Sequence, residues 1–207
     1  MPLGGDEGEP ATGPWVRRAG RILAAAPPWA TLHLDSVLRP DGSPGEYAWV
    51  EAPDVVRVLL LLPGRMAVVV RQWHYLTGPA WQLPGGTVDP GLDGEASGAR
   101  AHAAARELAE ETGIRAERLI PLASWEPAPG LTPMRVHVYL GSGVAGTGTA
   151  RPEPGEADLE VHRVPLAELV AATMDGRLRC AASAAAVHAA HGGHLPPGSR
   201  LPDAGGP

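Results

Sequence analysis

Residues 106–114 read Arg-Glu-Leu-Ala-Glu-Glu-Thr-Gly-Ile, and this short segment sets strong limits on the fold. As a helix, it places Glu107, Glu110 and Glu111 at positions i, i+3 and i+4, so their carboxylates share one face. Such carboxylates repel one another unless a cation lies among them, and Mg²⁺ takes oxygen ligands together with water and substrate phosphates. The pattern therefore predicts a metal-binding helix suited to phosphate chemistry. The alternative is an acidic helix face turned toward water.

An apolar stripe on the same helix predicts how it attaches to a core. Its members follow the spacing i, i+3, i+4, i+7 and are Ala101, Ala104, Ala105 and Leu108. Gly113 is placed to end the helix in the left-handed conformation. Upstream, residues 83–86 read Leu-Pro-Gly-Gly, which predicts a tight turn where glycine lets the backbone approach a ligand closely.

The two motifs together resemble the Nudix box, written G-x5-E-x7-R-E-U-x-E-E-x-G-U with U apolar. Its second half matches residues 106–114 at every specified position. The first half departs, because the box glutamate, counted from Gly86, falls on Leu92, and thirteen residues separate Leu92 from Arg106 where the family has seven. Glu95 is the nearest upstream carboxylate. We expect it to make the missing contact, or else to cap the start of the helix.

The resemblance implies a site for Mg²⁺ or Mn²⁺ with four ligands, one of them a backbone carbonyl: Gly85, Glu107, Glu110 and Glu111. It implies that Arg106 orients the glutamates, and that Glu107 or an acid from a later loop serves as general base. Glu156 and Glu160 match the family's E-x-x-x-E text, and we rank Glu156 first. The alternative for both is an ordinary acid on an exposed loop.

A second resemblance is to the ADP-ribose pyrophosphatase group within this family. That group has a Pro-Gly loop about fifteen residues beyond the box, and Pro129 and Gly130 occupy this position, although a Pro-Gly pair is also an ordinary turn. Trp29 and Tyr47 match by position the aromatic residues that stack on adenine there. The alternative interpretation is that both are ordinary aromatic residues half-buried on strands.

The strand exit at residues 71–74 reads Arg-Gln-Trp-His, where that group has R-Q-Y-R. His74 thus replaces a basic residue that helps to hold substrate, and a neutral histidine is a weaker phosphate partner than arginine. Arg71 either compensates or braces the sheet edge. The resemblance implies hydrolysis of ADP-ribose to AMP and ribose 5-phosphate. The alternatives are another nucleotide substrate, such as GDP-mannose or a nucleoside triphosphate, and a non-catalytic ligand-binding Nudix domain.

The apolar pattern predicts an α/β fold. Continuous apolar runs at 55–62 and 66–70, joined by a Pro-Gly-Arg turn, are typical of buried strands in a central sheet. Further strands are predicted at 119–125, 135–140 and 161–164, a loop at 141–157, and helices at 165–176 and 180–191. The resemblance implies a Nudix α/β/α sandwich with a mixed central sheet, the acidic helix on one side and the last two helices on the other.

The chain length favours one domain, which we place at residues 15–191. Within it, residues 15–52 form a predicted N-terminal antiparallel hairpin region, with a hairpin at 29–51. The resemblance implies that this region contacts substrate and forms a homodimer. Residues 1–14 and 192–207 are rich in Gly and Pro, and we predict disordered tails there.

Charge and cysteine content limit the partners. The net charge of −6 argues against a nucleic-acid or anionic-membrane surface, and Cys180 is the only cysteine, so no internal disulfide framework is expected. No apolar run approaches the ~20 residues of a membrane-spanning helix. We therefore expect a cytoplasmic protein with a small nucleoside diphosphate substrate and without nucleic-acid or membrane partners.

Overall fold

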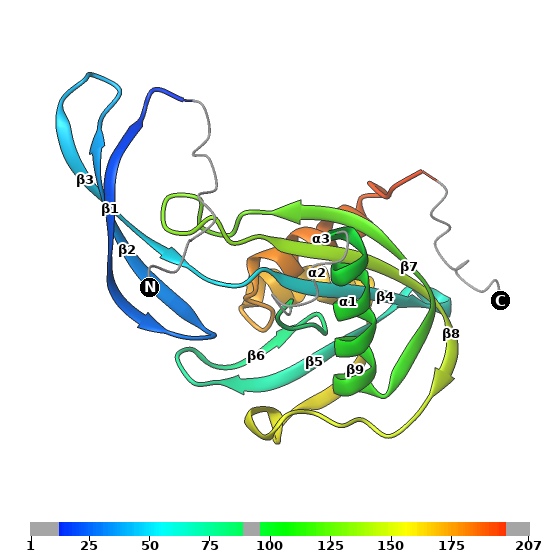
Figure 1. Ribbon diagram of the computed structural model, residues 1–207. Coiled ribbons are helices and arrows are strands. Elements are labelled where there is room, and N and C mark those ends of the chain that lie inside the picture. The colour runs from blue at the N-terminus through cyan, green and yellow to red at the C-terminus, as the bar shows by residue number, and fades with distance from the viewer. Residues whose placement is uncertain (1–12, 89–95, 198–207) are drawn as a thin grey trace. The chain divides into compact units, whose positions relative to one another are not determined.

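The computed structural model describes residues 13–88 and 96–197 (Figure 1). The chain divides into two compact units. The N-terminal unit is Met1–Ala52 with Ala128–Pro133, and the larger unit is Pro53–Pro127 with Met134–Pro207. Leu92, Glu95 and most of the two predicted tails lie outside the described residues, so the expectations for them stay predictions.

The N-terminal unit is a three-stranded antiparallel sheet of β1 (Val16–Ala26), β2 (Ala30–Leu38) and β3 (Pro44–Glu51), in that order. The predicted hairpin is β2 with β3. Its turn is closed by the Arg39 N–H, which donates to the Ser43 carbonyl at 2.9 Å. The sequence did not indicate β1. All eleven of its residues are exposed, so hydrogen bonds to β2 hold it, and burial imposes no alternation that could be recognised.

The larger unit contains a mixed six-stranded sheet. Its strands are β4 (Val55–Leu62), β5 (Met66–His74), β6 (Gly78–Gln82), β7 (Ile114–Trp125), β8 (Val136–Thr147) and β9 (Glu160–Pro165). The order is β6-β5-β4-β8-β7, with β9 paired to β5. Strands β4 and β8 run parallel, while the other pairs are antiparallel. Single-turn helices η1 (Pro63–Arg65) and η2 (Pro154–Glu156) lie in its connections.

Helices cover both faces of this sheet (Figure 1). Strand β4 divides the core, because its side chains alternate between the two faces. Val58 and Leu60 pack with α1 (Ala96–Thr112), whereas Leu59 and Leu61 pack with α2 (Leu166–Asp175) and α3 (Ala181–His191). The predicted α/β/α sandwich, with the acidic helix on one side and the last two helices on the other, is confirmed.

Two predictions at the element level were wrong. The first part of the loop expected at 141–157 is strand, since β8 continues to Thr147 and pairs there with Ile114 at the start of β7. Glycine-rich text indicated a loop, but the ladder to β7 supplies the backbone hydrogen bonds that such a segment needs. On α1, Ala105 is exposed and Ala103 is buried in its place, so the apolar stripe is turned slightly from the predicted one.

A hydrogen-bonded relay joins three strands near the start of β4. The buried ring of His137 lies 2.7 Å from Ser124 Oγ through Nδ1 and 2.8 Å from Asp54 Oδ2 through Nε2. The Arg135 N–H donates to the other oxygen of Asp54 at 2.8 Å. The histidine is thus a core residue whose two ring nitrogens both have hydrogen-bond partners.

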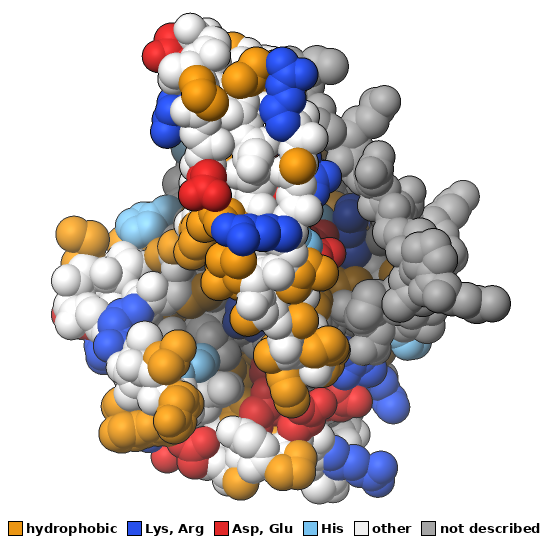
Figure 2. All heavy atoms as spheres, turned by 60° about the vertical axis from the view of Figure 1, so that its left-hand side comes forward, with side chains coloured by type: hydrophobic (Ala, Val, Ile, Leu, Met, Phe, Trp, Pro, Cys, Tyr) orange, Lys and Arg blue, Asp and Glu red, His pale blue; other side chains and the backbone are white. Residues whose placement is uncertain are grey.

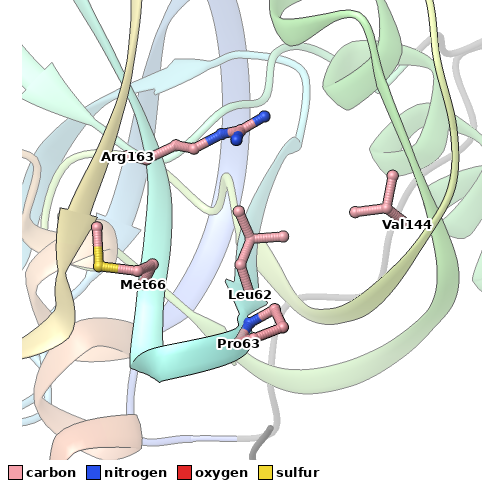
Figure 3. A pocket seen from close by; sticks show the side chains of 5 residues that line it. All are labelled: Leu62, Pro63, Met66, Val144 and Arg163. Atoms are coloured by element: carbon pink, nitrogen blue, oxygen red, sulfur yellow. The ribbon is translucent and has the colours of Figure 1, made fainter. Parts of the chain in front are cut away.

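A cavity of about 340 Å³ lies at the other end of β4 and is lined by Leu62, Pro63, Met66, Val144 and Arg163 (Figure 3). Its lining is apolar except for the exposed arginine of β9. None of the helices in the described part of the chain combines the length and the apolar character needed to cross a bilayer.

Candidate active site

Helix α1 buries two of its three clustered carboxylates. Glu107 is 9% exposed and Glu111 is 1% exposed, and they lie one turn apart on the helix. Glu110 is only half-buried. Burial of charged carboxylates is unfavourable unless a cation or hydrogen-bond donors meet them. The face that carries Glu107 and Glu111 is therefore built for a partner.

Arg106 binds two of the three clustered carboxylates. Its guanidinium contacts Glu107 Oε1 at 2.8 Å and Glu110 Oε2 at 2.7 Å, and it lies 3.4 Å from the carbonyl of Thr87. These contacts are compatible with the orienting role that the sequence predicted for Arg106. They also give Glu110 a cationic partner within the chain.

The glycine turn after β6 lies directly against the buried carboxylates. The Gly85 N–H donates to Glu111 Oε2 at 2.9 Å. A Cβ on Gly85, where φ is +145°, would lie 2.1 Å from the carbonyl oxygen of Val56, and a Cβ on Gly86 would lie 2.5 Å from Glu107 Oε1. Gly85 therefore requires glycine, and a side chain on Gly86 would displace the Glu107 carboxylate, which supports the close backbone approach predicted from the Leu-Pro-Gly-Gly text.

Burial dominates the electrostatics of the site. It raises the pKa of Glu111 to about 8, against the opposing effects of the Gly85 N–H and Arg57, and the charges of Glu156 and Glu107 add to the rise. Burial likewise raises the pKa of Glu107, with Arg106 opposing and Glu110 and Glu156 adding. The structure thus brings Glu156 of η2 within electrostatic range of both buried carboxylates.

The arrangement fits a divalent cation. Glu111 Oε1 is buried and has no hydrogen-bond partner among the described residues, so a buried carboxylate oxygen is left for a ligand. Carboxylate oxygens are the ligands that Mg²⁺ prefers, and one or two of them suffice when waters and substrate phosphates complete the shell. Within residues 13–88 and 96–197, no three His, Cys, Asp or Glu residues form a metal-binding group by themselves.

Arg57 contacts the glycine turn of the site, and its role was not predicted from the sequence. Its guanidinium donates to the carbonyl of Gly85 and lies 3.4 Å from Gln82 Oε1. Its charge also lowers the pKa of His74, after the larger effect of burial. A signal was present, because arginine interrupts an otherwise apolar strand at 55–62, and a charged residue in a buried strand needs a partner.

The remaining predicted residues of the larger unit lie on β5, on η2 and on β9. Arg71 forms an ion pair with Glu160 at 3.2 Å, which matches its alternative reading as a brace of the sheet edge. The Trp73 N–H donates to Asp158 Oδ2 at 2.8 Å. Glu156 closes η2, where its carboxylate accepts the Glu153 N–H at 3.1 Å. The segment after β8 is therefore tied to β5 at several points.

Four predicted substrate residues belong to the N-terminal unit. Tyr47 donates its hydroxyl to the carbonyl of Gly130 at 2.9 Å, so the structure brings these two together next to Pro129. Trp29 is 75% exposed, which leaves its ring free to stack. A further aromatic residue of this unit, Trp49, stacks on the ring of His33, with 4.0 Å between the ring centroids.

Several known proteins are similar to this chain in sequence. The NUDIX domain family model matches residues 52–182. An ADP-ribose pyrophosphatase from Mycobacterium tuberculosis is 30% identical over 162 residues, which cover 77% of this chain and 75% of that protein. A CMP-5'-(N-acetyl-N-hydroxy-3-aminopropyl)phosphonate hydrolase from Streptomyces rubellomurinus is 29% identical, with coverage of 79% and 75%.

The fold has a solved counterpart. A crystal structure of an ADP compounds hydrolase superposes with a TM-score of 0.71 at 19% identity, covering 86% of this chain and 92% of that one. At this identity the likeness concerns the fold. Together with the family match over the box and the glycine turn, it leads to one conclusion: the chain belongs to the Nudix family and is a pyrophosphohydrolase related to the ADP-ribose pyrophosphatases.

Proposed function

We propose that this enzyme hydrolyses the diphosphate of a nucleoside diphosphate sugar, with ADP-ribose as its main substrate and AMP and ribose 5-phosphate as products. One observation carries the proposal: within the described part of the chain, the buried carboxylate of Glu111 keeps an oxygen without a partner beside Glu107 and the glycine turn. The names of two similar proteins, from Mycobacterium tuberculosis and Bacillus subtilis, support ADP-ribose as the first substrate to test. A cytoplasmic location is part of the proposal.

Glu107 and Glu111 would hold Mg²⁺ or Mn²⁺, with water and substrate phosphates completing the shell. The resemblance implies two further ligands. Of these, Glu110 accepts a hydrogen bond from Arg106, and the Gly85 carbonyl accepts one from Arg57. When bound, the ion neutralises phosphate charge and makes a bound water more acidic. Arg106 keeps the Glu107 carboxylate in place, and the Gly85 N–H keeps that of Glu111.

Glu156 is the residue that we propose as general base, ahead of Glu107. Its carboxylate is within electrostatic range of Glu107 and Glu111, and the residue is half-buried. It would accept a proton from the attacking water as the bond between phosphorus and the bridging oxygen breaks. Glu107 already shares its carboxylate with Arg106, which makes it the poorer proton acceptor.

Within the larger unit, Arg71 and His74 on β5 are proposed contacts for the substrate phosphates. Within the N-terminal unit, taken by itself, the residues proposed to contact a nucleoside are Trp29, Tyr47, Pro129 and Gly130. Burial, followed by the charges of Arg57 and Arg179, lowers the pKa of His74 and favours its neutral form. A neutral imidazole holds phosphate less firmly than a guanidinium, so other nucleotides remain rivals of ADP-ribose.

The test is a substrate panel with Mg²⁺. We expect ADP-ribose to be cleaved to AMP and ribose 5-phosphate at a higher kcat/KM than GDP-mannose, a nucleoside triphosphate or a cytidylyl phosphonate. Product identity by ³¹P NMR distinguishes cleavage of the diphosphate from loss of a terminal phosphate. Preference for another member of the panel would replace ADP-ribose as substrate. Tight binding of ADP-ribose without any turnover would support the ligand-binding alternative.

We also propose a homodimer formed through the N-terminal unit. Its exposed apolar side chains include Trp15, Ile22, Leu23 and Trp29, more than a sheet turned to water usually presents. The space-filling view in Figure 2 shows apolar side chains gathered on the face of the molecule that is turned toward the viewer. Light scattering at micromolar protein should give twice the chain mass, and Ile22→Asp should shift it toward the monomer. A monomer mass for the unaltered chain would contradict the proposal.

A further inference from the structure

Three consecutive carbonyls of the glycine turn are all satisfied by three consecutive residues of β4. The Val58 N–H donates to the carbonyl of Pro84 at 2.8 Å, and the Val56 N–H donates to that of Gly86 at 2.9 Å. The Arg57 side chain lies between them in sequence and donates to the carbonyl of Gly85. The turn is therefore fixed to β4 by two backbone contacts and one cationic side chain.

The Gly85 carbonyl is the oxygen that the family resemblance assigns to a metal ion. In this chain a guanidinium already meets it, and a guanidinium does not deprotonate in proteins. Two cations at one carbonyl would repel each other. The same residue also gives its N–H to Glu111, so Arg57, Gly85 and the buried carboxylate form one connected group.

We propose that Arg57 takes the place of a metal ion at the Gly85 carbonyl, and that its fixed charge opposes cation binding at the neighbouring site of Glu107 and Glu111. The proposal rests on the metal-dependent function proposed above and deepens it. Arg57 supplies a fixed positive charge that holds the turn against Glu111 and limits cation binding to the carboxylate side. The chain thereby needs fewer metal ions than an enzyme in which this carbonyl is free.

The test measures Mn²⁺ binding without substrate, by the loss of the free-ion signal in electron paramagnetic resonance. Arg57→Gln removes the charge and keeps a shorter side chain that can still donate a hydrogen bond. We expect it to bind Mn²⁺ about tenfold more tightly than the unaltered chain, the order of one close charge–charge interaction. Arg57→Lys keeps the charge and should bind as the unaltered chain does. A residue that only supported the fold would weaken binding when replaced.

Two controls separate the possible failures. Arg163→Gln changes an exposed arginine beside the cavity at the far end of β4 and should leave Mn²⁺ affinity unchanged. Glu111→Gln should lose the site. If it binds Mn²⁺ normally, the proposed metal site and this inference both fall. If it loses binding while Arg57→Gln binds no better than the unaltered chain, the inference about Arg57 alone is wrong. If Arg57→Lys gained as much Mn²⁺ affinity as Arg57→Gln, the inference about Arg57 would also be wrong.

Discussion

Glu111→Gln is expected to lower turnover by ~100-fold or more, the order seen when a charge-stabilising group is removed from an active site. The change keeps the shape of the side chain but removes the charge of the most buried carboxylate in the site, which is 1% exposed. The Gly85 N–H can still donate to the amide oxygen, so the glycine turn should keep its place. Circular dichroism and kcat with Mg²⁺ check fold and turnover separately.

The same variant has an expected effect on metal-free stability. The pKa of Glu111 is raised from 4.5 to about 8, first by burial, so the folded chain keeps a proton that the unfolded chain releases. This contribution to the free energy of unfolding is fully present below pH 4.5, the pKa of the group in the unfolded chain. It is lost as the pH rises through about 8, its pKa in the folded chain. In a chelator, the unaltered chain should melt at a lower temperature above pH 8 than at about pH 5. Glu111→Gln should show a smaller decrease.

Glu168→Gln is the matched control, because Glu168 lies on α2 and pairs with Arg177 at the surface. It should retain turnover and the same pH dependence of melting as the unaltered chain. Near-normal turnover of Glu111→Gln in Mg²⁺ would show that the buried carboxylate does not serve a metal. An equal dependence of melting on pH in Glu111→Gln would show that another group releases the proton.

Gly85→Ala is expected to lower the free energy of unfolding by about 3 kcal/mol or more, since a left-handed conformation and a backbone clash add together. The φ of +145° is one that side chains rarely adopt, and the new Cβ would lie 2.1 Å from the Val56 carbonyl oxygen. That oxygen belongs to a central strand and cannot move aside cheaply. The turn would have to move away from β4, and the hydrogen bond from the Gly85 N–H to Glu111 would then be lost.

A glycine elsewhere supplies the control for this variant. Gly98 lies in α1, and a Cβ added there would meet no atom of the described residues within 4 Å. Gly98→Ala should therefore raise stability by up to about 1 kcal/mol, because alanine restricts the unfolded chain more than glycine does. Urea unfolding of both variants in a chelator measures the difference without any contribution from metal. Equal stability of Gly85→Ala and the unaltered chain would mean that the turn is not held against β4 as described.

The order of strands and helices in the larger unit could largely be predicted, because each element has a local signal. The apolar run at 55–62, the helical spacing in 106–114 and the glycine at 176 each correspond to an element boundary or face. Strand β1 could not be predicted, since its residues are exposed and their pattern records no buried face. The extension of β8 to Thr147 depends on pairing with β7, which a local pattern of glycines does not reveal.

The site followed the same division. The sequence motif predicted the glutamates, Arg106 and the glycine turn, and the structure brings them together. Which oxygens are free was not predictable, because this depends on partners distant in sequence. Arg57 meets the Gly85 carbonyl from another strand, 28 positions away. The arginine is visible in the sequence as a charge in an apolar run, but its target is fixed only by the packing of the turn on β4.

We propose above that the buried pair Glu107 and Glu111 binds a divalent ion on which hydrolysis depends. The most direct measurement is the rate of AMP release from ADP-ribose by the chelator-treated enzyme, before and after addition of Mg²⁺, with Glu111→Gln alongside. We expect no AMP release without metal, full recovery on addition of Mg²⁺, and no recovery in Glu111→Gln. Release of AMP at an unchanged rate in the chelator, or recovery in Glu111→Gln equal to that of the unaltered enzyme, would contradict the proposal.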